Sequence, residues 1–469
     1  MIKHILSNVC FLFFFCVALI AQKDINQNEI PNIIIILADD LGYKDVGFNG
    51  SIDIPTPNID RIANEGVKFR NAYVSYAVCG PSRAGLITGR YQDRFGFSRN
   101  PLFAPNDVKM GLPLSELTLA DALSPAGYKS IALGKWHLGA HPDLHPLKRG
   151  FDDFYGFLSG GHDYFPELYT LNGVYDAKKQ YDGYKTKLLR NYERVEEKEY
   201  LTDALSREAV NYIEKYKDQP FFMYLAYNAP HTPLQATEKY LERFENIKNE
   251  KRKIYGAMVS AMDDGVGRVL NKLEELKISE NTMVFFLSDN GGPERVNASD
   301  NGLLRGGKGD LFEGGVHVPF ALRWPDKIDP MVYDSPVSAL DIFATAINPV
   351  KNEITLKNPL DGVDLLPFLQ GTNNGMPHSF LFWRKYDQKW SSVRKSDGEK
   401  LLKNPKDTLL FNLKKDISET NEMKDEDLMH NLLDQYQLWE NNLRDPVFLG
   451  LLQNDLYNRK HPDRFTKPD

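Results

Sequence analysis

Cysteine is scarce in this sequence. The chain has 469 residues and only three cysteines, and two of these, Cys10 and Cys16, lie in an apolar stretch near the N-terminus. Beyond that stretch only Cys79 remains, so the rest of the chain cannot form an intrachain disulfide. A disulfide-stapled scaffold is therefore excluded, and the single thiol at position 79 needs an explanation of its own.

A basic excess is also missing. The formal net charge is −7, whereas nucleic-acid-binding domains usually carry clustered lysine and arginine. The balance argues against nucleic acid as a partner but leaves room for a local basic pocket that takes an anionic substrate. With 42% hydrophobic and 26% charged residues, the composition is that of a globular protein, and the length is sufficient for two domains.

No apolar run is long enough to cross a membrane. The run from Val9 to Ala21 follows Lys3 and His4 and is shorter than the roughly 18 residues that a spanning helix needs. Such a segment is typical of a signal peptide, which we place at residues 1–21. We therefore expect bacterial export to the periplasm or the medium, with no stable membrane insertion after cleavage. A lipid anchor on Cys16 is the alternative.

The stretch from Cys79 to Arg90 reads as the beginning of a helix. Pro81 suits a first turn, where its missing N–H would be unpaired anyway. Cys79 then lies at the positive end of the helix, where anions are stabilised, and Arg83 points back toward the same end. A lone cysteine before a helix is more often structural, so the case for chemistry depends on the whole stretch.

Two pairs of oxygen-bearing side chains follow apolar runs without alternation. Asp39 and Asp40 follow one run, and Asp289 and Asn290 follow another. Runs of this kind are typical of strands buried in a parallel sheet, and ligands bind beyond the carboxyl ends of such strands. Adjacent buried carboxylates need compensation, and a cation is the simplest kind. Oxygen ligands favour Ca²⁺, or less strongly Mg²⁺, over Zn²⁺; a helix-capping aspartate is the alternative.

Basic and imidazole side chains follow other predicted strands. Lys135 and His137 are two residues apart and face the same way, His231 is held between two prolines, and Lys308 lies in a glycine-rich stretch without a P-loop pattern. These residue types suit anion binding and proton transfer. Solvated lysines and packed histidines are the alternative interpretation of the same pattern.

From Cys79 to Arg90 the sequence resembles the sulfatase signature, Cys-x-Pro-Ser-Arg followed by Leu-x-Thr-Gly-Arg, and every fixed position is matched. The Gly-Lys-Trp-His run that contains Lys135 is similar to the family as well. The resemblance covers about residues 30–440. It implies an alkaline-phosphatase-like α/β fold and hydrolysis of a sulfate monoester. It also implies that a maturation enzyme oxidises Cys79 to formylglycine, whose hydrate supplies the attacking hydroxyl.

The resemblance implies a role for each site residue. The implied calcium ligands are Asp39, Asp40, Cys79 as formylglycine, Asp289 and Asn290. Arg83, Lys135 and Lys308 would surround the sulfate. His231 would protonate the departing alcohol, and His137 would deprotonate the second hydroxyl of the hydrate to release sulfate. Relatives often carry a hydroxyl side chain where this chain has Gly161, so one hydrogen bond of the family is not expected here.

We expect a central, mostly parallel sheet flanked by helices in a catalytic domain at residues 22–376. A smaller C-terminal subdomain at 377–469 should contain an antiparallel sheet and one helix. The predicted strands are 32–38, 67–76, 128–133, 220–227, 281–287, 316–323, 381–384, 390–394, 400–403 and 408–413. The predicted helices are 58–65, 118–123, 201–216, 252–278, 338–347 and 428–443. Residues 140–200 should be irregular and either shape a binding site or be poorly ordered, and 458–469 should be a loose tail.

The implied partner is a sulfated oligo- or polysaccharide such as ulvan, carrageenan or a glycosaminoglycan. Loop residues that could contact the sugar are His141, Arg149, His162, Tyr164, Arg305 and Arg384. Two alternatives stay open. One is a phosphomonoester, phosphodiester or phosphonate hydrolase of the same superfamily, which would typically carry histidine in place of Asn290. The other is a catalytically inactive, sugar-binding relative.

Overall fold

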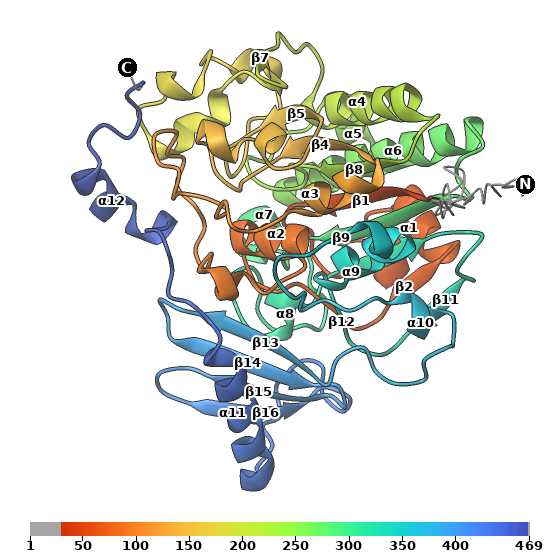
Figure 1. Cartoon of the computed structure of the whole chain (residues 1–469), viewed down its shortest axis with the longest axis vertical. Helices are drawn as coiled ribbons and strands as arrows, with labels where there is room; N and C mark the ends of the chain where they lie inside the picture. Colours follow the sequence, from red (N-terminus) through yellow and green to blue (C-terminus); the bar gives the residue numbers. More distant parts are fainter. Residues whose placement is uncertain (1–29, 468–469) are drawn as a thin grey trace, which may run out of the picture.

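The centre of the molecule is a mixed sheet of ten strands in the order β11-β2-β10-β9-β1-β8-β4-β5-β6-β7 (Figure 1). The computed structural model describes residues 30–467. The five strands in the middle are β9 (Thr282–Ser288), β1 (Asn32–Ala38), β8 (Phe221–Ala226), β4 (Lys129–Lys135) and β5 (Asp153–Phe157), and they are mutually parallel. The expected α/β fold with a mostly parallel sheet is confirmed.

Strand β1 explains the apolar run without alternation. All its residues are buried. Ile33, Ile35 and Leu37 belong to one hydrophobic cluster, whereas Ile34 and Ile36 belong to the cluster on the other face. The first cluster includes residues of α2 (Cys79–Thr88), α3 (Leu119–Leu123) and α9 (Asp341–Ile347). The second includes residues of α1 (Pro57–Asn64), α4 (Leu201–Tyr216) and α6 (Glu250–Glu275). Both faces of the strand are therefore covered by helices.

The order of the parallel strands determines where the site lies. In β9, β1, β8 and β4 the carboxyl ends are at the same edge of the sheet. Asp39 follows β1, Asp289 follows β9, His231 comes shortly after β8, and Lys135 is the last residue of β4. Polar residues that are far apart in the sequence thus meet at one edge, as expected for an open α/β sheet.

A separate antiparallel sheet follows in the C-terminal part of the chain (blue in Figure 1). Its strands are β13 (Phe380–Lys385), β14 (Trp390–Lys395), β15 (Glu399–Lys403) and β16 (Thr408–Asn412). Helix α11 (Glu426–Glu440) packs on this sheet through a small cluster that includes Val393, Leu401, Leu432 and Trp439. The expected four strands and one helix are all present.

Several predicted elements differ from the observed ones. The predicted strand at 67–76 is two short strands, β2 (Val67–Phe69) and β3 (Ala72–Tyr73), because the chain leaves the main sheet and pairs with β12 (Val337–Ser338). The strand predicted at 316–323 is the helical turn α8 (Glu313–Val316) followed by β10 (Phe320–Arg323). The loose tail was a wrong prediction, since helix α12 (Asn454–Lys460) is formed and Arg464 is 2% exposed.

Short elements complete the structure. Three strands lie at the sheet's ends, namely β11 (Met331–Tyr333), β6 (Leu189–Arg190) and β7 (Glu193–Arg194), and α5 (Glu238–Leu241), α7 (Glu294–Asn297) and α10 (Leu366–Leu369) are short helices. Among residues 30–467, no helix combines the length and apolarity that a membrane crossing requires. The signal peptide predicted at residues 1–21 lies outside the described part of the chain.

Candidate functional site

Three carboxylates converge where β1 and β9 end. Asp39, Asp40 and Asp289 each offer an oxygen, and these oxygens lie within 4.8 Å of one another. Backbone hydrogen bonds fix two of them, because the amide of Asp289 donates to the carbonyl of Ala38 (3.0 Å) and that of Asp39 to the carbonyl of Ala229, just after β8 (3.0 Å). Asp40 has a φ of 65°, a left-handed conformation that is uncommon outside glycine. The chain thus makes a sharp bend at the carboxylates.

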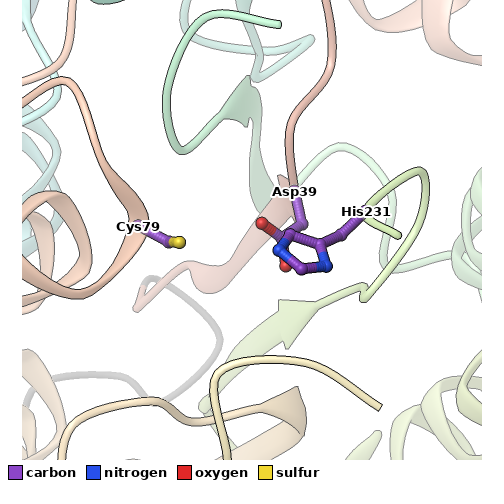
Figure 2. A group of neighbouring side chains, drawn as sticks. All are labelled: Asp39, Cys79 and His231. Carbon is purple, nitrogen blue, oxygen red and sulfur yellow. The ribbon is translucent and has the colours of Figure 1, made fainter. Parts of the chain in front are cut away.

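The thiol of Cys79 faces the same place. Cys79 is the first residue of α2, and its Sγ lies within 4.8 Å of a carboxylate oxygen of Asp39 and a ring nitrogen of His231. Figure 2 shows the thiol pointing from the helix toward Asp39 and His231. The cysteine is buried, but it faces a carboxylate and an imidazole instead of apolar packing.

Three cations surround the carboxylates. Arg83 Nε donates to Asp289 Oδ2 at 2.8 Å, and its Nη1 donates to the carbonyl of Lys135 at 3.0 Å. Lys135 Nζ donates to Asp39, and Lys308 Nζ lies 2.7 Å from Asp40 Oδ1. Burial alone would lower the pKa of Arg83, but the charges of Asp289 and Asp39 raise it above its ordinary value. The guanidinium therefore stays charged although it is fully buried.

Both predicted histidines lie in this group. Burial, together with the charges of Lys135, Arg83 and Lys308, holds the pKa of His137 well below its usual value. Burial also lowers the pKa of His231 to about 3, against the opposing charge of Asp40. Nδ1 of His231 bonds the carbonyl of Thr232 (2.6 Å), and its Nε2 lies 3.7 Å from Asp40 Oδ2. Both rings are therefore neutral at neutral pH in this arrangement.

The acceptor atoms at this edge fit a hard divalent cation. Among the described residues, Asp39 Oδ1 and Asn290 Oδ1 are buried without a hydrogen-bond partner. The amide nitrogen of Asn290 donates to Asp40 Oδ1 (2.7 Å) and to the carbonyl of Gly291 (3.0 Å), so its oxygen is left available. Burial and the neighbouring charge of Asp39 raise the pKa of Asp289 to about 6. Crowded, buried oxygen donors of this kind suit Ca²⁺ or Mg²⁺.

Four of the six suggested sugar contacts are internal to the fold. His162 is buried with both ring nitrogens on backbone carbonyls, and Tyr164 donates to the carbonyls of Asn228 and His231. Arg149 binds backbone carbonyls, and Arg384 binds Asp93 and a carbonyl. These predictions were wrong, because all four side chains are occupied in holding loops together. His141 and Arg305 are less buried and stay predictions.

One residue beside the site was missed by the sequence reasoning. The ring of Tyr184 has its centroid 6.5 Å from that of His231, and a charge on Cys79 raises the pKa of its hydroxyl further than burial alone. Tyr184 lies in a 3₁₀ segment, Gln180–Lys185, within the irregular region. The only available signal was that this region is rich in tyrosine.

The sulfatase family profile matches residues 31–348. The chain belongs to the sulfatase family. It is 34% identical over 406 residues to the uncharacterized sulfatase YdeN of Escherichia coli (strain K12), covering 75% of this chain and 68% of that protein. It is 36% identical over 356 residues to human N-acetylgalactosamine-6-sulfatase, covering 73% of this chain and 66% of that protein. The chain thus spans about two thirds of these curated relatives.

A solved structure matches a larger share of this sulfatase than the two curated relatives do. Ps i-CgsB in complex with k-i-k-neocarrahexaose has a TM-score of 0.84 and 39% sequence identity, and the likeness covers 93% of this chain and 100% of that one. The family, the shared fold and the relatives together make the chain a sulfuric ester hydrolase. The phosphohydrolase and inactive-relative alternatives are accordingly disfavoured.

Proposed function

We propose that this sulfatase removes O-sulfate from a sulfated carbohydrate, and that a carrageenan-type galactan is the first substrate to test. The observation that carries the proposal is the meeting of three cations, an oxygen-ligand cluster and Cys79 at one sheet edge. Arg83 and Lys135 are fully buried, and Lys308 is partly buried. The choice of sugar is supported by the likeness to Ps i-CgsB, which was solved with k-i-k-neocarrahexaose. Ulvan and glycosaminoglycans are the other sugars to include.

Residue 79 needs a chemical change before it can act. Burial raises the pKa of the Cys79 thiol, although Lys135 and Lys308 oppose the effect, so a reactive thiolate is disfavoured. After oxidation by a maturation enzyme, formylglycine at this position would supply the hydroxyl of a hydrated aldehyde. Asp39, Asp40, Asp289 and Asn290 would hold Ca²⁺, which when bound would polarise a sulfate oxygen and favour loss of that hydroxyl's proton.

The three cations have a direct role in the proposal. A sulfate ester is an anion, so a nucleophile is repelled unless positive charge neutralises its oxygens. Arg83, Lys135 and Lys308 present that charge from three different elements, and each is held by a carboxylate. Because Arg83 and Lys135 are buried and Lys308 is partly buried, their attraction for an anion is less screened than at the surface.

The two histidines are placed for proton transfer. His231 lies beside Cys79 and Asp39, where a bound sulfate would add negative charge and favour its protonated form. With Lys308, it would protonate the bridging sugar oxygen as its bond to sulfur breaks, so that the sugar leaves as an alcohol. His137 is a buried neutral imidazole whose Nδ1 has no hydrogen-bond partner among the described residues, so it is able to accept a proton during sulfate release.

Export completes the proposal. A signal peptide at residues 1–21 would deliver the enzyme to the periplasm or the medium, where large sulfated polysaccharides are found. The domain bounds 22–376 and 377–469 remain part of the same proposal. Nothing in the composition favours a nucleic-acid partner, since the net charge is −7.

The decisive experiment measures sulfate release by ion chromatography. The protein, made with a formylglycine-generating enzyme, is incubated with defined oligosaccharides of carrageenan, ulvan and glycosaminoglycans, and with nitrophenyl phosphate. We expect release from a carrageenan oligosaccharide and little or no phosphate release. Release from no sulfated saccharide, or faster hydrolysis of the phosphate ester, would contradict the proposal.

Cys79→Ser is the matched variant for the nucleophile. It keeps a hydroxyl at the same place but cannot become an aldehyde hydrate, so a sulfated serine would not be able to eliminate sulfate. We expect no steady-state turnover and an unchanged melting temperature, with mass spectrometry of the wild-type peptide showing the aldehyde. Repeated turnover by Cys79→Ser would refute the role proposed for residue 79.

A further inference from the structure

Two adjacent glycines make room for two groups at the site. A Cβ at Gly160 would lie 2.7 Å from Nε2 of His137, and a Cβ at Gly161 would lie 2.7 Å from both Cζ and Oη of Tyr184. The missing side chains therefore allow an imidazole and a phenol to come close to the backbone of this loop. The space that a side chain at position 161 would fill is occupied by the hydroxyl end of Tyr184.

The ring of Tyr184 lies beside that of His231, which is itself next to Cys79 and Asp39. Its ring meets that of His231 at an interplanar angle of 63°, with 6.5 Å between centroids. Besides burial, the charges that act on its hydroxyl are those of Cys79, Lys308, Asp39 and Tyr181. Burial comes first among the causes that raise the pKa of the phenol, so the hydroxyl keeps its proton and is a hydrogen-bond donor throughout the ordinary pH range.

The loop that carries the glycines and the segment that carries Tyr184 are fastened together. The amide of Asp163 donates to the carbonyl of Tyr184 (3.0 Å). Ser159 Oγ bonds the carbonyls of Gly161 (2.7 Å) and Gly183 (3.0 Å). The ring of His162 bridges to the carbonyl of Thr186 at 2.7 Å. The position of the phenol is therefore set before a substrate arrives.

The loop that carries Gly160 and Gly161 is also hydrogen-bonded to the segment that carries His231. Asn228 Nδ2 donates to the carbonyl of His162 at 2.9 Å, and Tyr164 Oη donates to the carbonyls of Asn228 (2.7 Å) and His231 (2.8 Å). Tyr184 and His231 thus belong to one hydrogen-bonded frame. Within it, Tyr184 is half-buried.

We propose that Tyr184 is a substrate-binding residue whose hydroxyl donates a hydrogen bond to an oxygen of the sulfate ester held between Cys79, Lys308 and His231. The inference rests on the proposed function. A hydrogen bond to an ionised group is stronger than one between neutral groups. Its loss should lower kcat/KM by about 10- to 100-fold.

The test compares Tyr184→Phe with Tyr181→Phe. Tyr181 lies in the same 3₁₀ segment and touches the Tyr184 ring edge-on, but it is 60% exposed. With sulfated neocarratetraose as the probe, we expect a fall in kcat/KM of at least about tenfold for Tyr184→Phe and no comparable change for Tyr181→Phe. A Tyr184→Phe enzyme within about twofold of wild type would overturn the inference.

A binding measurement separates this inference from the proposed function. In a Cys79→Ala background, which cannot turn over, calorimetry with the same tetrasaccharide should show a Kd raised by about tenfold or more when Tyr184→Phe is added. An unchanged Kd would overturn the role of Tyr184. Binding with this dependence but no sulfate release by the mature wild type would contradict the catalytic proposal alone.

Gly161→Ser gives a second route to the same question. Its side chain would occupy the place of the phenol hydroxyl, because the Cβ alone comes within 2.7 Å of that oxygen. We expect the serine to displace the phenol and to raise the Kd in the Cys79→Ala background. In a Tyr184→Phe background the same substitution should cause little further loss. Equal losses in both backgrounds would contradict the role of the phenol hydroxyl.

Discussion

Two regions of this sulfatase bury charged groups, and they do so differently. At the edge of the ten-stranded sheet, three carboxylates face three cations, yet Asp39 Oδ1, Asn290 Oδ1 and His137 Nδ1 have no hydrogen-bond partner among the described residues. Beside the C-terminal sheet, Lys400 is buried between Glu313 and Glu419 at 2.8 and 2.9 Å. In the second region Glu419 Oε1 also lacks a hydrogen bond, but it lies 2.9 Å from Lys400 Nζ, so its charge is paired within the fold.

The second cluster shows what a structural charge network looks like. Glu313 also accepts from Tyr73 Oη at 2.7 Å and lies 3.0 Å from His317 Nδ1, while its amide donates to Glu419. Burial would raise the pKa of Glu313, but the charge of Lys400 and the bond from His317 hold it below its usual value. Strand β15 is thereby joined to helix α8.

The difference between the regions is a guide to function. Buried polar groups normally find partners, so the unpaired acceptors of Asp39 and Asn290, which lie together with three cations and Cys79, favour a ligand site at this edge. The two regions are also connected. Lys385 of the small sheet donates to the carbonyl of Gly309, next to Lys308, and Arg305 donates to the carbonyl of Glu419 at 2.8 Å. The C-terminal sheet thus supports the loop that carries Lys308.

Removing divalent ions should have the largest effect. Exhaustive chelation followed by dialysis is expected to abolish sulfate release from the oligosaccharide that the enzyme hydrolyses. The crowded carboxylates would lose the cation that they bind. Ca²⁺ should restore the activity better than Mg²⁺, and the melting temperature should rise with Ca²⁺ concentration, since the ion binds the folded state. Full activity after chelation, with no metal detected by mass spectrometry, would contradict the assignment of this edge as a metal site.

Breaking the internal cluster should instead act on stability. Lys400→Met leaves Glu313 and Glu419 buried without their cation, and removing one partner of a buried pair typically costs about 3–5 kcal/mol. We expect a large fall in the free energy of unfolding measured with denaturant. Lys403→Met is the matched control, because Lys403 is on the same strand but exposed. A stability change no larger than that of the control would show that the cluster contributes little.

The charged and catalytic residues of the site could be predicted from the sequence better than the residues that line the pocket around them. Asp39, Asp289 and His231 could be placed at one edge because apolar runs identify parallel strands, and such strands end on the same side of a sheet. Cys79 could be placed at a helix beginning because Pro81 follows it. The roles of these residues remain predictions until the enzyme is assayed, but their convergence is a property of the structure.

The residues that shape the pocket could not be read in the same way. Arg149 and His162 looked like free loop residues, yet both are bound to backbone carbonyls. Tyr184 lies in a 3₁₀ segment without periodicity, and its position depends on Gly161, far from it in sequence. The pairing of Glu313 with Lys400 joins helix α8 to strand β15, which are far apart in the sequence. Such contacts depend on the packing of irregular segments, which leaves no local pattern.

The smallest predicted effect concerns the junction between helix α9 and the C-terminal sheet, and it depends on pH. His378, just before β13, has Nε2 2.8 Å from Oδ1 of Asp341, the first residue of α9. Burial lowers the pKa of His378, but the charge of Asp341 outweighs it and the pKa is raised above the ordinary value. The stabilisation is therefore fully present below about pH 6.5 and is lost as the pH rises through the folded-state pKa.

His378→Gln should therefore destabilise the protein by about 1.5–3 kcal/mol near pH 6 and by less near pH 9. His430→Gln is the control, because His430 is exposed on α11 and bonds only the carbonyl of Glu426. Denaturant unfolding of both variants at the two pH values measures the difference. An equal loss for His378→Gln at both pH values would mean that the side chain acts through packing, and that the ion pair with Asp341 does not stabilise the junction.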